Sequence, residues 1–394
     1  MELAEERPQD AQVRQRLGRA CYELGEKEAA LAHFGQAMVL NPNDAESSYW
    51  IGGICQSLGD IDGARTAYAR AAQIAPLIRR NAVKSPADFR LLALYAPFAG
   101  NTPAEFLFAE AAYDTDTLAL LATSRIDAAA LGGVDVIVNL ISDPDQAAAE
   151  LPIAAALAAT LGKPVINDPV RIERTTREGV AALLPGIEGC CVPKILRLDA
   201  GADVTAAALE AMLPFAFPLL ARPAGTHGGD DFEKIETLEA LSDFLGQLGG
   251  DRYLIEYVDY ASHDGLFRKY RFIFVDDEIL PYHLAIGTDW KLHHDSTDMG
   301  DHEWMQREEA AFLENPGAVF DAGHYAALRE IRARIGLDYF GIDCGLDRDG
   351  RLVVFEVNAS MLVHADNAEF SYKDPYVRAI KAAFDAMLRR RVRQ

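Results

Sequence analysis

The sequence predicts a multidomain protein in which all-α helical hairpins come first, an α/β layer follows, and an α+β body completes the chain. Three observations lead to this prediction. A length of 394 residues exceeds what a single core usually supports. Residues 1–80 contain an internal repeat. Beyond them, short apolar runs alternate with helical patterns and then give way to strand-rich sequence.

The repeat in residues 1–80 has a period of 34 residues and matches at eight positions. The matched positions are Leu17, Gly18, Cys21, Gly25, Ala30, Phe34, Ala37 and Pro42, which recur as Ile51, Gly52, Cys55, Gly59, Ala64, Tyr68, Ala71 and Pro76. The small residues let two antiparallel helices approach, the aromatic ring fills the space between them, and the proline ends the second helix. The paired cysteines share a repeat position, so we interpret both as packing residues.

This period and pattern resemble the tetratricopeptide repeat. Each unit of that kind leaves an apolar face open, and about three or more units are normally needed for stability. The two units are therefore expected either to lean on the body that follows or to form a homodimer. The resemblance also implies that they recruit a peptide or protein partner.

Composition and charge exclude several classes of protein. The chain has 60 acidic and 38 basic residues, a net charge of −22 that would repel nucleic acid. The apolar stretch 151–161 is too short to span a bilayer, so no membrane partner is expected. The acidic N-terminus lacks the apolar run that a secretory signal contains. The five cysteines are scattered and form no CxxC or disulfide pattern. These features predict a cytoplasmic location.

An α/β layer is predicted between residues 87 and 168. The stretch 76–86 is polar and bounded by prolines, as a connector between domains would be. Apolar runs typical of buried parallel strands, and helical patterns between them, then alternate. The predicted strands are 89–96, 117–122 and 134–141, and the predicted helices are 103–112 and 146–161. No GxGxxG follows the first strand, so a dinucleotide-binding fingerprint is absent.

A glycine-rich turn follows the predicted strand 217–222. Arg222 ends the strand, and Gly225, Gly228 and Gly229 follow within a few residues. Glycines let backbone N–H groups approach phosphate oxygens, while the arginine adds a permanent charge. Taken alone, the same pattern also suits a tight hairpin turn.

Two further strands carry polar residues in an apolar context. The run 253–258 is apolar except at Glu256. In 268–275, a period of two places Lys269 and Arg271 on one face and aromatic residues on the other. Facing a cavity, Arg271 would bind phosphate or carboxylate oxygens; facing water, it would be an ordinary exterior residue.

A β-hairpin is predicted from a strand at 340–344, a turn at 347–350 and a returning strand at 351–358. Asp343, Glu356 and Asn358 would converge on one face, and their oxygens are the hard ligands that Mg²⁺ prefers. The alternative is a pair of edge-strand acids facing water. Glu356 disfavours that alternative because apolar residues flank it on both sides.

These segments resemble the ATP-grasp superfamily, in particular its glutathione synthetase/RimK branch of carboxylate–amine ligases. Five blocks occur in the family's order: PVINDP, FPLLARPAGTHGG, YLIEYV, KYRFIFVDDEILPYHLAI and FGIDCGLDRDGRLVVFEVNAS. The resemblance implies tetratricopeptide repeats at 1–80, a pre-ATP-grasp α/β domain at 87–168 and an ATP-grasp domain at 169–394. It further implies ATP, Mg²⁺ (or Mn²⁺ in its place), and a peptide or amide bond formed through an acyl phosphate.

The resemblance assigns roles to individual residues. Asp343, Glu356 and Asn358 match the metal ligands, and Arg271 matches the arginine that steadies the acyl phosphate. Adenine would contact the backbone of Glu256, Tyr257 and Val258, and ribose would contact Asp264. Phosphates would contact Gly225, Gly228, Gly229 and two cations. The cations are Arg222, where the family usually has a lysine, and Lys194. Met361 stands where the family often has a proline.

The polar stretch 287–304 allows three interpretations. His293, His294 and His302 could form a zinc cluster with nearby acids. The resemblance instead implies a flap over the acyl phosphate, with Lys291 or a histidine reaching inward. A solvated loop is the third alternative. We favour the flap, because adjacent histidines do not readily bind one ion together.

The leading hypothesis is an ATP-dependent ligase that joins a carboxylate to an amine. A non-catalytic ATP-binding scaffold is the second, and a kinase that stops at phosphoryl transfer is the third. The sequence leaves open which acid and amine are joined and whether either belongs to a peptide.

Overall fold

The computed structural model describes residues 9–121, 126–225, 231–292, 297–365 and 367–394. The chain divides into two compact units. Unit 1 comprises Met1–Phe98 and Glu110–Asp135, and unit 2 comprises Ala99–Ala109 and Val136–Gln394. The division into three domains that the sequence predicts stays a prediction.

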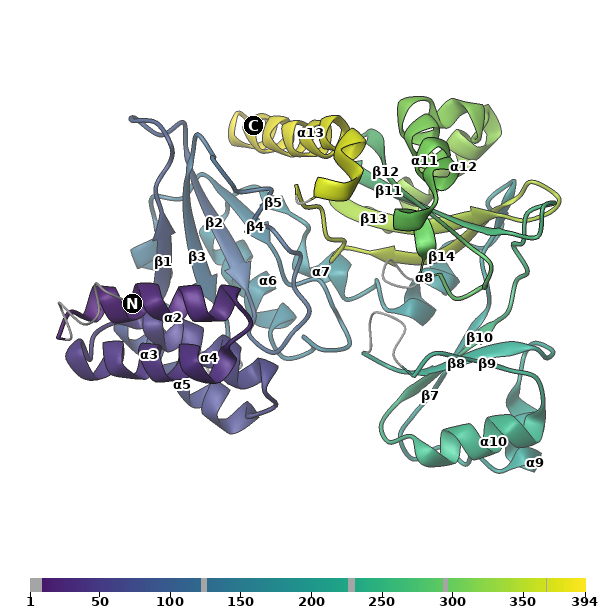
Figure 1. Ribbon diagram of the computed structural model, residues 1–394, viewed down its shortest axis with the longest axis horizontal. Helices are drawn as coiled ribbons and strands as arrows, with labels where there is room; N and C mark the ends of the chain where they lie inside the picture. Colours follow the sequence, from purple (N-terminus) through teal and green to yellow (C-terminus); the bar gives the residue numbers. More distant parts are fainter. Residues whose placement is uncertain (1–8, 122–125, 226–230, 293–296, 366) are drawn as a thin grey trace. The chain divides into compact units, whose positions relative to one another are not determined.

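Unit 1 begins with two helical hairpins (Figure 1). They consist of α2 (Ala11–Glu23), α3 (Lys27–Leu40), α4 (Ala45–Ser57) and α5 (Ile61–Ile74). The side chains of Asp10, Asp44 and Asp60 cap three of these helices by accepting backbone N–H groups. A Cβ at Gly52 would lie 2.8 Å from the Tyr68 ring, which explains the glycine of the repeat.

The second hairpin packs against the rest of unit 1. The ring of Tyr68 contacts the ring of Phe98 edge-on at 5.4 Å, and the Arg65 guanidinium lies 5.2 Å from the same ring. These contacts cover part of the second hairpin, and self-association of the repeats stays a prediction.

Three strands complete the described sheet of unit 1. β2 (Arg90–Tyr95) is parallel to β3 (Asp114–Ala119), and β1 (Leu77–Arg80) is antiparallel to β3. The stretch 76–86, which we expected to be a plain connector, thus contributes an edge strand. A 3₁₀ helix, η1 (Ala128–Leu131), follows.

In unit 2, β4 (Val136–Asn139) and β5 (Val165–Ile166) pair in parallel, with α6 (Leu151–Leu161) between them along the chain. The predicted helix at 103–112 is wrong: residues 105–110 form turns. Only Phe108 makes an i→i−4 bond there, and Glu110 has a φ of +50°, which a right-handed helix cannot continue through. α6 begins five residues later than predicted, because Asp143 caps a turn by accepting the N–H groups of Asp145 and Gln146.

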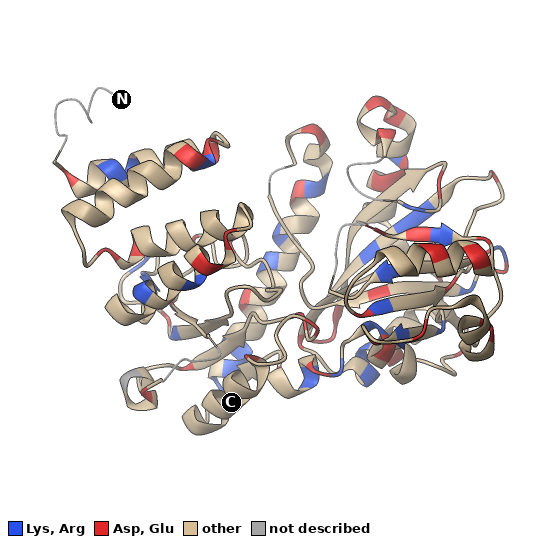
Figure 2. Cartoon of the chain, turned by 90° about the horizontal axis from the view of Figure 1, so that it is seen from below, with Lys and Arg blue, Asp and Glu red and all other residues tan. Residues whose placement is uncertain are grey.

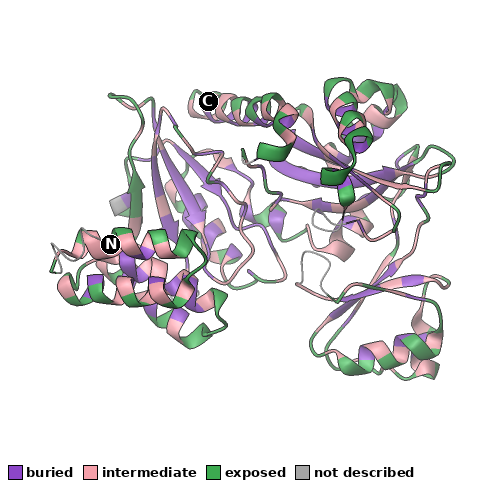
Figure 3. Ribbon diagram, viewed as in Figure 1, coloured by how far each residue is buried: buried purple, intermediate pink, exposed green. Residues whose placement is uncertain are grey.

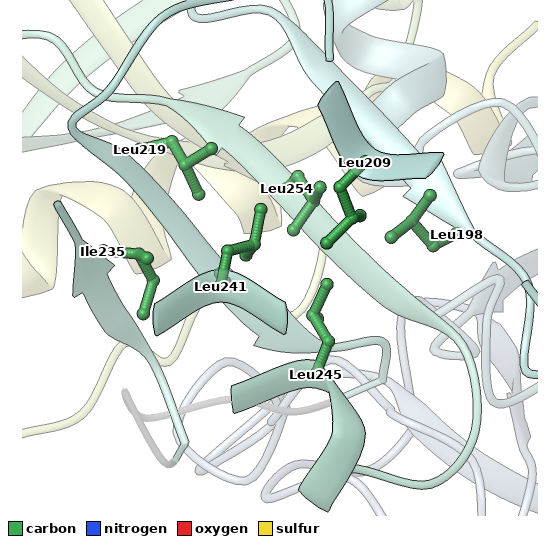
Figure 4. Packing of buried hydrophobic residues seen from close by; sticks show 8 residues of the cluster. Leu198, Leu209, Leu219, Ile235, Leu241, Leu245 and Leu254 are labelled. Atoms are coloured by element: carbon green, nitrogen blue, oxygen red, sulfur yellow. The ribbon is translucent and has the colours of Figure 1, made fainter. Parts of the chain in front are cut away.

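A small antiparallel sheet follows, with strand order β7-β10-β8-β9. Its strands are β7 (Ile195–Leu198), β8 (Leu219–Pro223), β9 (Glu233–Ile235) and β10 (Arg252–Glu256). α9 (Ala206–Met212) and α10 (Leu238–Gln247) cover one face. The core between sheet and helices is built of leucines, one isoleucine and one alanine (Figure 4): Leu198, Leu209, Leu219, Ala221, Ile235, Leu241, Leu245 and Leu254.

The large sheet has the order β12-β11-β13-β14-β6, and β13 is buried over nearly its whole length (Figure 3). They are β6 (Cys190–Cys191), β11 (Phe267–Val275), β12 (Glu278–Gly287), β13 (Tyr339–Leu346) and β14 (Leu352–Asn358). Only β6 is parallel to its neighbour. The predicted hairpin of β13 and β14 is confirmed.

Helices α11 (Glu303–Glu314), α12 (Ala322–Ile335) and α13 (Asp374–Val392) pack against the large sheet. Tyr270 and Phe272 contact the rings of Phe312 and Phe320 on this side, which confirms the aromatic face of β11. The shorter helices are α7 (Pro169–Ile172), α8 (Arg177–Leu183), η3 (Asp298–Asp301), η4 (Pro316–Ala318) and η5 (Ala368–Lys373). Among the helices of the described residues, none combines the length and the apolar character that a membrane crossing requires.

Candidate functional site

A cavity of about 430 Å³ lies within unit 2, lined by residues from both the small and the large sheet. It brings together residues that lie up to 185 positions apart in the sequence, from Arg177 to Leu362. The predicted site residues among its lining are Arg222, Glu256, Tyr257, Val258, Arg271, Lys291, Asp343, Glu356 and Asn358.

The three predicted metal ligands lie together on the β13–β14 hairpin. Asp343 pairs directly with Glu356 across the two strands, and Asn358 pairs with Gly341. A bulge follows, because Cys344 pairs with Val354 and the intervening Phe355 is skipped. The amide nitrogen of Asn358 lies 3.4 Å from Oε1 of Glu356.

Basic and acidic residues lie side by side on the strands of the large sheet (Figure 2). Arg271 donates from Nε and Nη2 to the two oxygens of Asp343, at 2.6 and 2.9 Å. Nζ of Lys269 lies 3.6 Å from Oδ2 of the same carboxylate. Burial alone would raise the pKa of Asp343, but the adjacent arginine and lysine lower it well below its usual range. Asp343 is therefore an anion at neutral pH. Glu356 accepts a hydrogen bond from Nη2 of Arg177 at 2.8 Å.

The trio is suited to a metal ion that nucleotide phosphates help to hold. Within the described residues, no three His, Cys, Asp or Glu side chains are grouped as a protein-only metal site would be. Two carboxylates and one amide oxygen supply fewer ligands than an octahedral ion needs, and Mg²⁺ is usually bound in this way, with phosphate oxygens completing the set. The Asn358 oxygen accepts from the N–H and hydroxyl groups of Ser360, at 2.7 and 2.5 Å, which fixes its orientation.

Cations from three different segments border the cavity. Arg222, at the end of β8, is 5% exposed and its guanidinium lies 5.2 Å from the ring of Phe232. Lys291 donates to the Phe232 carbonyl at 2.9 Å, and Lys269 donates to the Leu292 carbonyl at 2.6 Å. These bonds tie the segment after β12 to both sheets of unit 2.

The cavity also has aromatic and apolar lining residues. Trp290 contacts the rings of Phe232 and Tyr257 edge-on, at 5.3 and 6.2 Å. Leu220 and Ile255 line the cavity as well. The lining thus mixes charged and apolar groups, as ligand-binding cavities commonly do.

Several predicted residues do not line this cavity. Lys194 is exposed. Its backbone N–H donates to the Glu256 carboxylate at 3.0 Å, and its carbonyl accepts the backbone N–H of Glu256 at 2.9 Å. Asp264 is exposed and bound twice by Arg268, which lowers its pKa to about 2. Gly225 lies in the turn after β8, with a φ of +70°, and its carbonyl accepts a hydrogen bond from Gln146 at 2.8 Å. Gly228, Gly229, His293 and His294 lie outside the described residues.

Arg177 and Lys269 line the cavity but were not predicted as site residues. Arg177 is the first residue of α8, directly after the capping residue Thr176. A cation in the first turn opposes the helix dipole, so its position there was a signal that the sequence offered. Lys269 shares a strand face with Arg271, and that alternation was the corresponding signal.

Comparison with known proteins gives two results. Models of the tetratricopeptide repeat match residues 11–44 and 45–76, so the predicted repeats are confirmed. No curated protein sequence matches the chain.

Among solved structures, the chain is similar to a D-alanine–D-alanine ligase from Bacillus anthracis complexed with ATP (13% identity, TM-score 0.46, 78% of this chain and 99% of that one). It is also similar to a RimK domain ATP-grasp protein from Sphaerobacter thermophilus (14%, 0.44, 76% and 98%). A third is a D-Ala:D-Ser ligase from Enterococcus faecalis (14%, 0.43, 74% and 99%). These values describe a loose likeness, so the function proposed below depends on this chain's own residues.

Proposed function

We propose that the protein is an ATP-dependent ligase that joins a carboxylate to an amine through an acyl phosphate. One observation carries the proposal: a single cavity combines five basic side chains with the carboxylate and amide oxygens of one hairpin. The basic residues are Arg177, Arg222, Lys269, Arg271 and Lys291.

ATP would match the mixed lining of the cavity. The base would lie beside Leu220 and Ile255 and next to the backbone of Glu256–Val258. The phosphates would lie between Arg222 and the hairpin, where guanidinium groups provide forked hydrogen bonds. Asp343, Glu356 and Asn358 would hold Mg²⁺, which would neutralise charge on the β and γ phosphates.

The reaction would have two steps. A carboxylate oxygen attacks the γ phosphorus, the bond to the β-phosphate oxygen breaks, and ADP leaves. An amine nitrogen then attacks the acyl carbon, phosphate leaves, and the nitrogen loses a proton to give the amide. Arg271 would stabilise the negative charge on the acyl phosphate, while the segment with Trp290 and Lys291 excludes water.

The repeats would recruit a peptide or protein that carries one of the substrates, or would mediate self-association. We do not expect nucleic acid or membrane as a partner. The five cysteines are free thiols, as expected of a protein of the cytoplasm.

The test is phosphate release from ATP and Mg²⁺ with a panel of carboxylates and amines. Release that requires both an acid and an amine, with an amide detected by mass spectrometry, supports the ligase. A stable phosphorylated product formed without an amine would indicate a kinase instead.

A nucleotide-binding scaffold without turnover is the second candidate. It is favoured by the two hydrogen bonds from Arg271 that engage both oxygens of Asp343. Trp290 lines the cavity, so its fluorescence should respond to ATP in either case. A fluorescence response that is absent from Trp290→Phe, combined with no phosphate release for any substrate pair, would favour the scaffold.

A further inference from the structure

Three polar side chains form a row across one face of the small sheet. Tyr253 on β10 pairs with Arg197 on β7 and with Arg222 on β8. Cross-strand partners share a face of a sheet. Their chain neighbours, including Leu198 and Leu254, point into the leucine core on the other face. The row therefore lies on the face away from α9 and α10, and Arg222 at its end lines the cavity.

The loop after β4 contacts this row at its other end. Asp145 accepts a hydrogen bond from Arg197 Nη1 at 2.6 Å and one from the Tyr253 hydroxyl at 2.9 Å. Tyr253 is only 1% exposed, so its hydroxyl depends on protein partners. The next residue, Gln146, donates to the carbonyl of Gly225 at 2.8 Å. Two consecutive loop residues thus hold both the row and Gly225, which follows β8.

The loop itself is fixed in place. Asp143, 6% exposed, accepts the backbone N–H groups of Asp145 and Gln146 at 2.8 and 3.2 Å. The contact is therefore made by an ordered turn against a short sheet.

We propose that Asp145 and Gln146 are positioning residues for the phosphate-binding part of the cavity. By holding Arg197, Tyr253 and the Gly225 carbonyl, they set the end of β8, from which Arg222 reaches the phosphates of a nucleotide. This inference rests on the proposed function, because it assumes that the cavity binds ATP. Neither residue lines the cavity of Arg222, whereas Asp145 lines a smaller cavity together with Gly225, Glu356 and Asn358.

Asp251 provides a matched control. It binds the same arginine, with Oδ2 lying 2.7 Å from Nη2 and 3.2 Å from Nε of Arg197. It belongs to the turn that leads into β10, so its ion pair stays inside the small sheet and does not reach the β4 loop. Asp251→Asn therefore weakens a comparable ion pair and leaves the contact between the loop and the row intact.

The experiment compares Asp145→Ala, Gln146→Ala and Asp251→Asn in the full chain. We measure the Kd of ATP with Mg²⁺, the Kd of adenosine, and the melting temperature without ligand. Asp145→Ala should weaken ATP binding about tenfold, because it removes two hydrogen bonds, one of them to a cation. Gln146→Ala, which loses one exposed neutral bond, should weaken it about threefold. Asp251→Asn should stay within twofold of the wild type.

Adenosine separates positioning from general damage. It has no phosphates, so Asp145→Ala should leave its Kd unchanged. An equal loss of adenosine and ATP binding would overturn the proposal, as would an Asp145→Ala variant that binds ATP like the wild type. In an Arg222→Ala background, Asp145→Ala should weaken ATP binding little further. If the two substitutions weakened ATP binding additively, the positioning role would also be contradicted. A wild-type chain that binds ATP yet releases no phosphate would refute the ligase but not this positioning role.

Discussion

Replacing Glu356 by glutamine tests the hairpin as a metal site with the smallest possible change. The two side chains have nearly the same size, and the amide oxygen of glutamine can still accept the hydrogen bond from Arg177. What is lost is one negative charge among the three predicted ligands. The variant should therefore fold normally and fail in catalysis.

The structure gives the expected magnitudes. The Arg177–Glu356 pair is partly exposed, with side-chain exposures of 19% and 26%, so weakening it should cost about 1 kcal/mol of stability or less. Removing one preorganised electrostatic contact from a reacting phosphate typically costs roughly 100- to 1,000-fold in rate. Phosphate release should thus fall by about two orders of magnitude or more, with a melting temperature close to that of the wild type.

The assay is phosphate release at saturating ATP, with thermal unfolding measured on the same samples. Glu308→Gln is the matched control: Glu308 also pairs with an arginine, Arg268, at 2.5 Å, and it does not line the cavity. It should keep wild-type turnover. If Glu356→Gln turned over as fast as this control, the metal assignment of the hairpin would be wrong.

Three further predictions concern the packing, the pH dependence and the reaction. Gly52→Ala should destabilise the helical hairpins by roughly 1–2 kcal/mol in thermal unfolding, because the new Cβ would lie 2.8 Å from the Tyr68 ring. At Gly53 the nearest atom to a Cβ is the Tyr68 hydroxyl at 3.6 Å, so Gly53→Ala should be neutral or stabilising. Burial lowers the pKa of His283 to about 4. As the pH falls from 6.5 to 4, the unfolded chain therefore takes up a proton that the folded chain does not, and the free energy of unfolding should decrease by up to roughly 3 kcal/mol. His283→Gln should flatten this pH dependence. Arg271→Lys keeps the positive charge but loses the bidentate hydrogen bonding of the guanidinium group. It should lower kcat for phosphate release at least about tenfold and change the Kd of ATP less than threefold.

The parts of the fold that follow from local patterns could be predicted from the sequence. The period of 34 residues gave the helical hairpins, and the alternation in β11 gave a cationic and an aromatic face. The hairpin of Asp343 and Glu356 was predictable because one turn brings its two strands together. In each case the partners are close in the chain or repeat at a fixed period, so the pattern contains the geometry.

Contacts between distant segments could not be predicted in this way. Arg177 meets Glu356 across 179 residues, and no local period connects them. Asp264 was expected at the ribose, but Arg268 binds it outside the cavity while also binding Glu308, 40 residues further along the chain. Asn167 of the PVINDP block shows the same limit: its side chain bonds the backbone of Tyr339 through both its oxygen and its nitrogen, a structural role that the sequence did not suggest.

The charges of the cavity would allow an acidic protein to bind a polyphosphate, as we propose. The chain carries a net charge of −22, yet the lining has five lysine or arginine residues against three acids. Without a ligand, these groups neutralise one another, as Arg271 does with Asp343 and Arg177 with Glu356. A phosphate bound alone would pair with Arg271 and Arg177 and leave the carboxylates of Asp343 and Glu356 without a partner. A metal ion bound alone would leave the two arginines without a partner. Both outcomes cost free energy in a site shielded from water. A metal–phosphate pair satisfies both sets at once. The cavity is therefore complementary to a nucleotide bound together with its metal ion and poorly suited to either one alone.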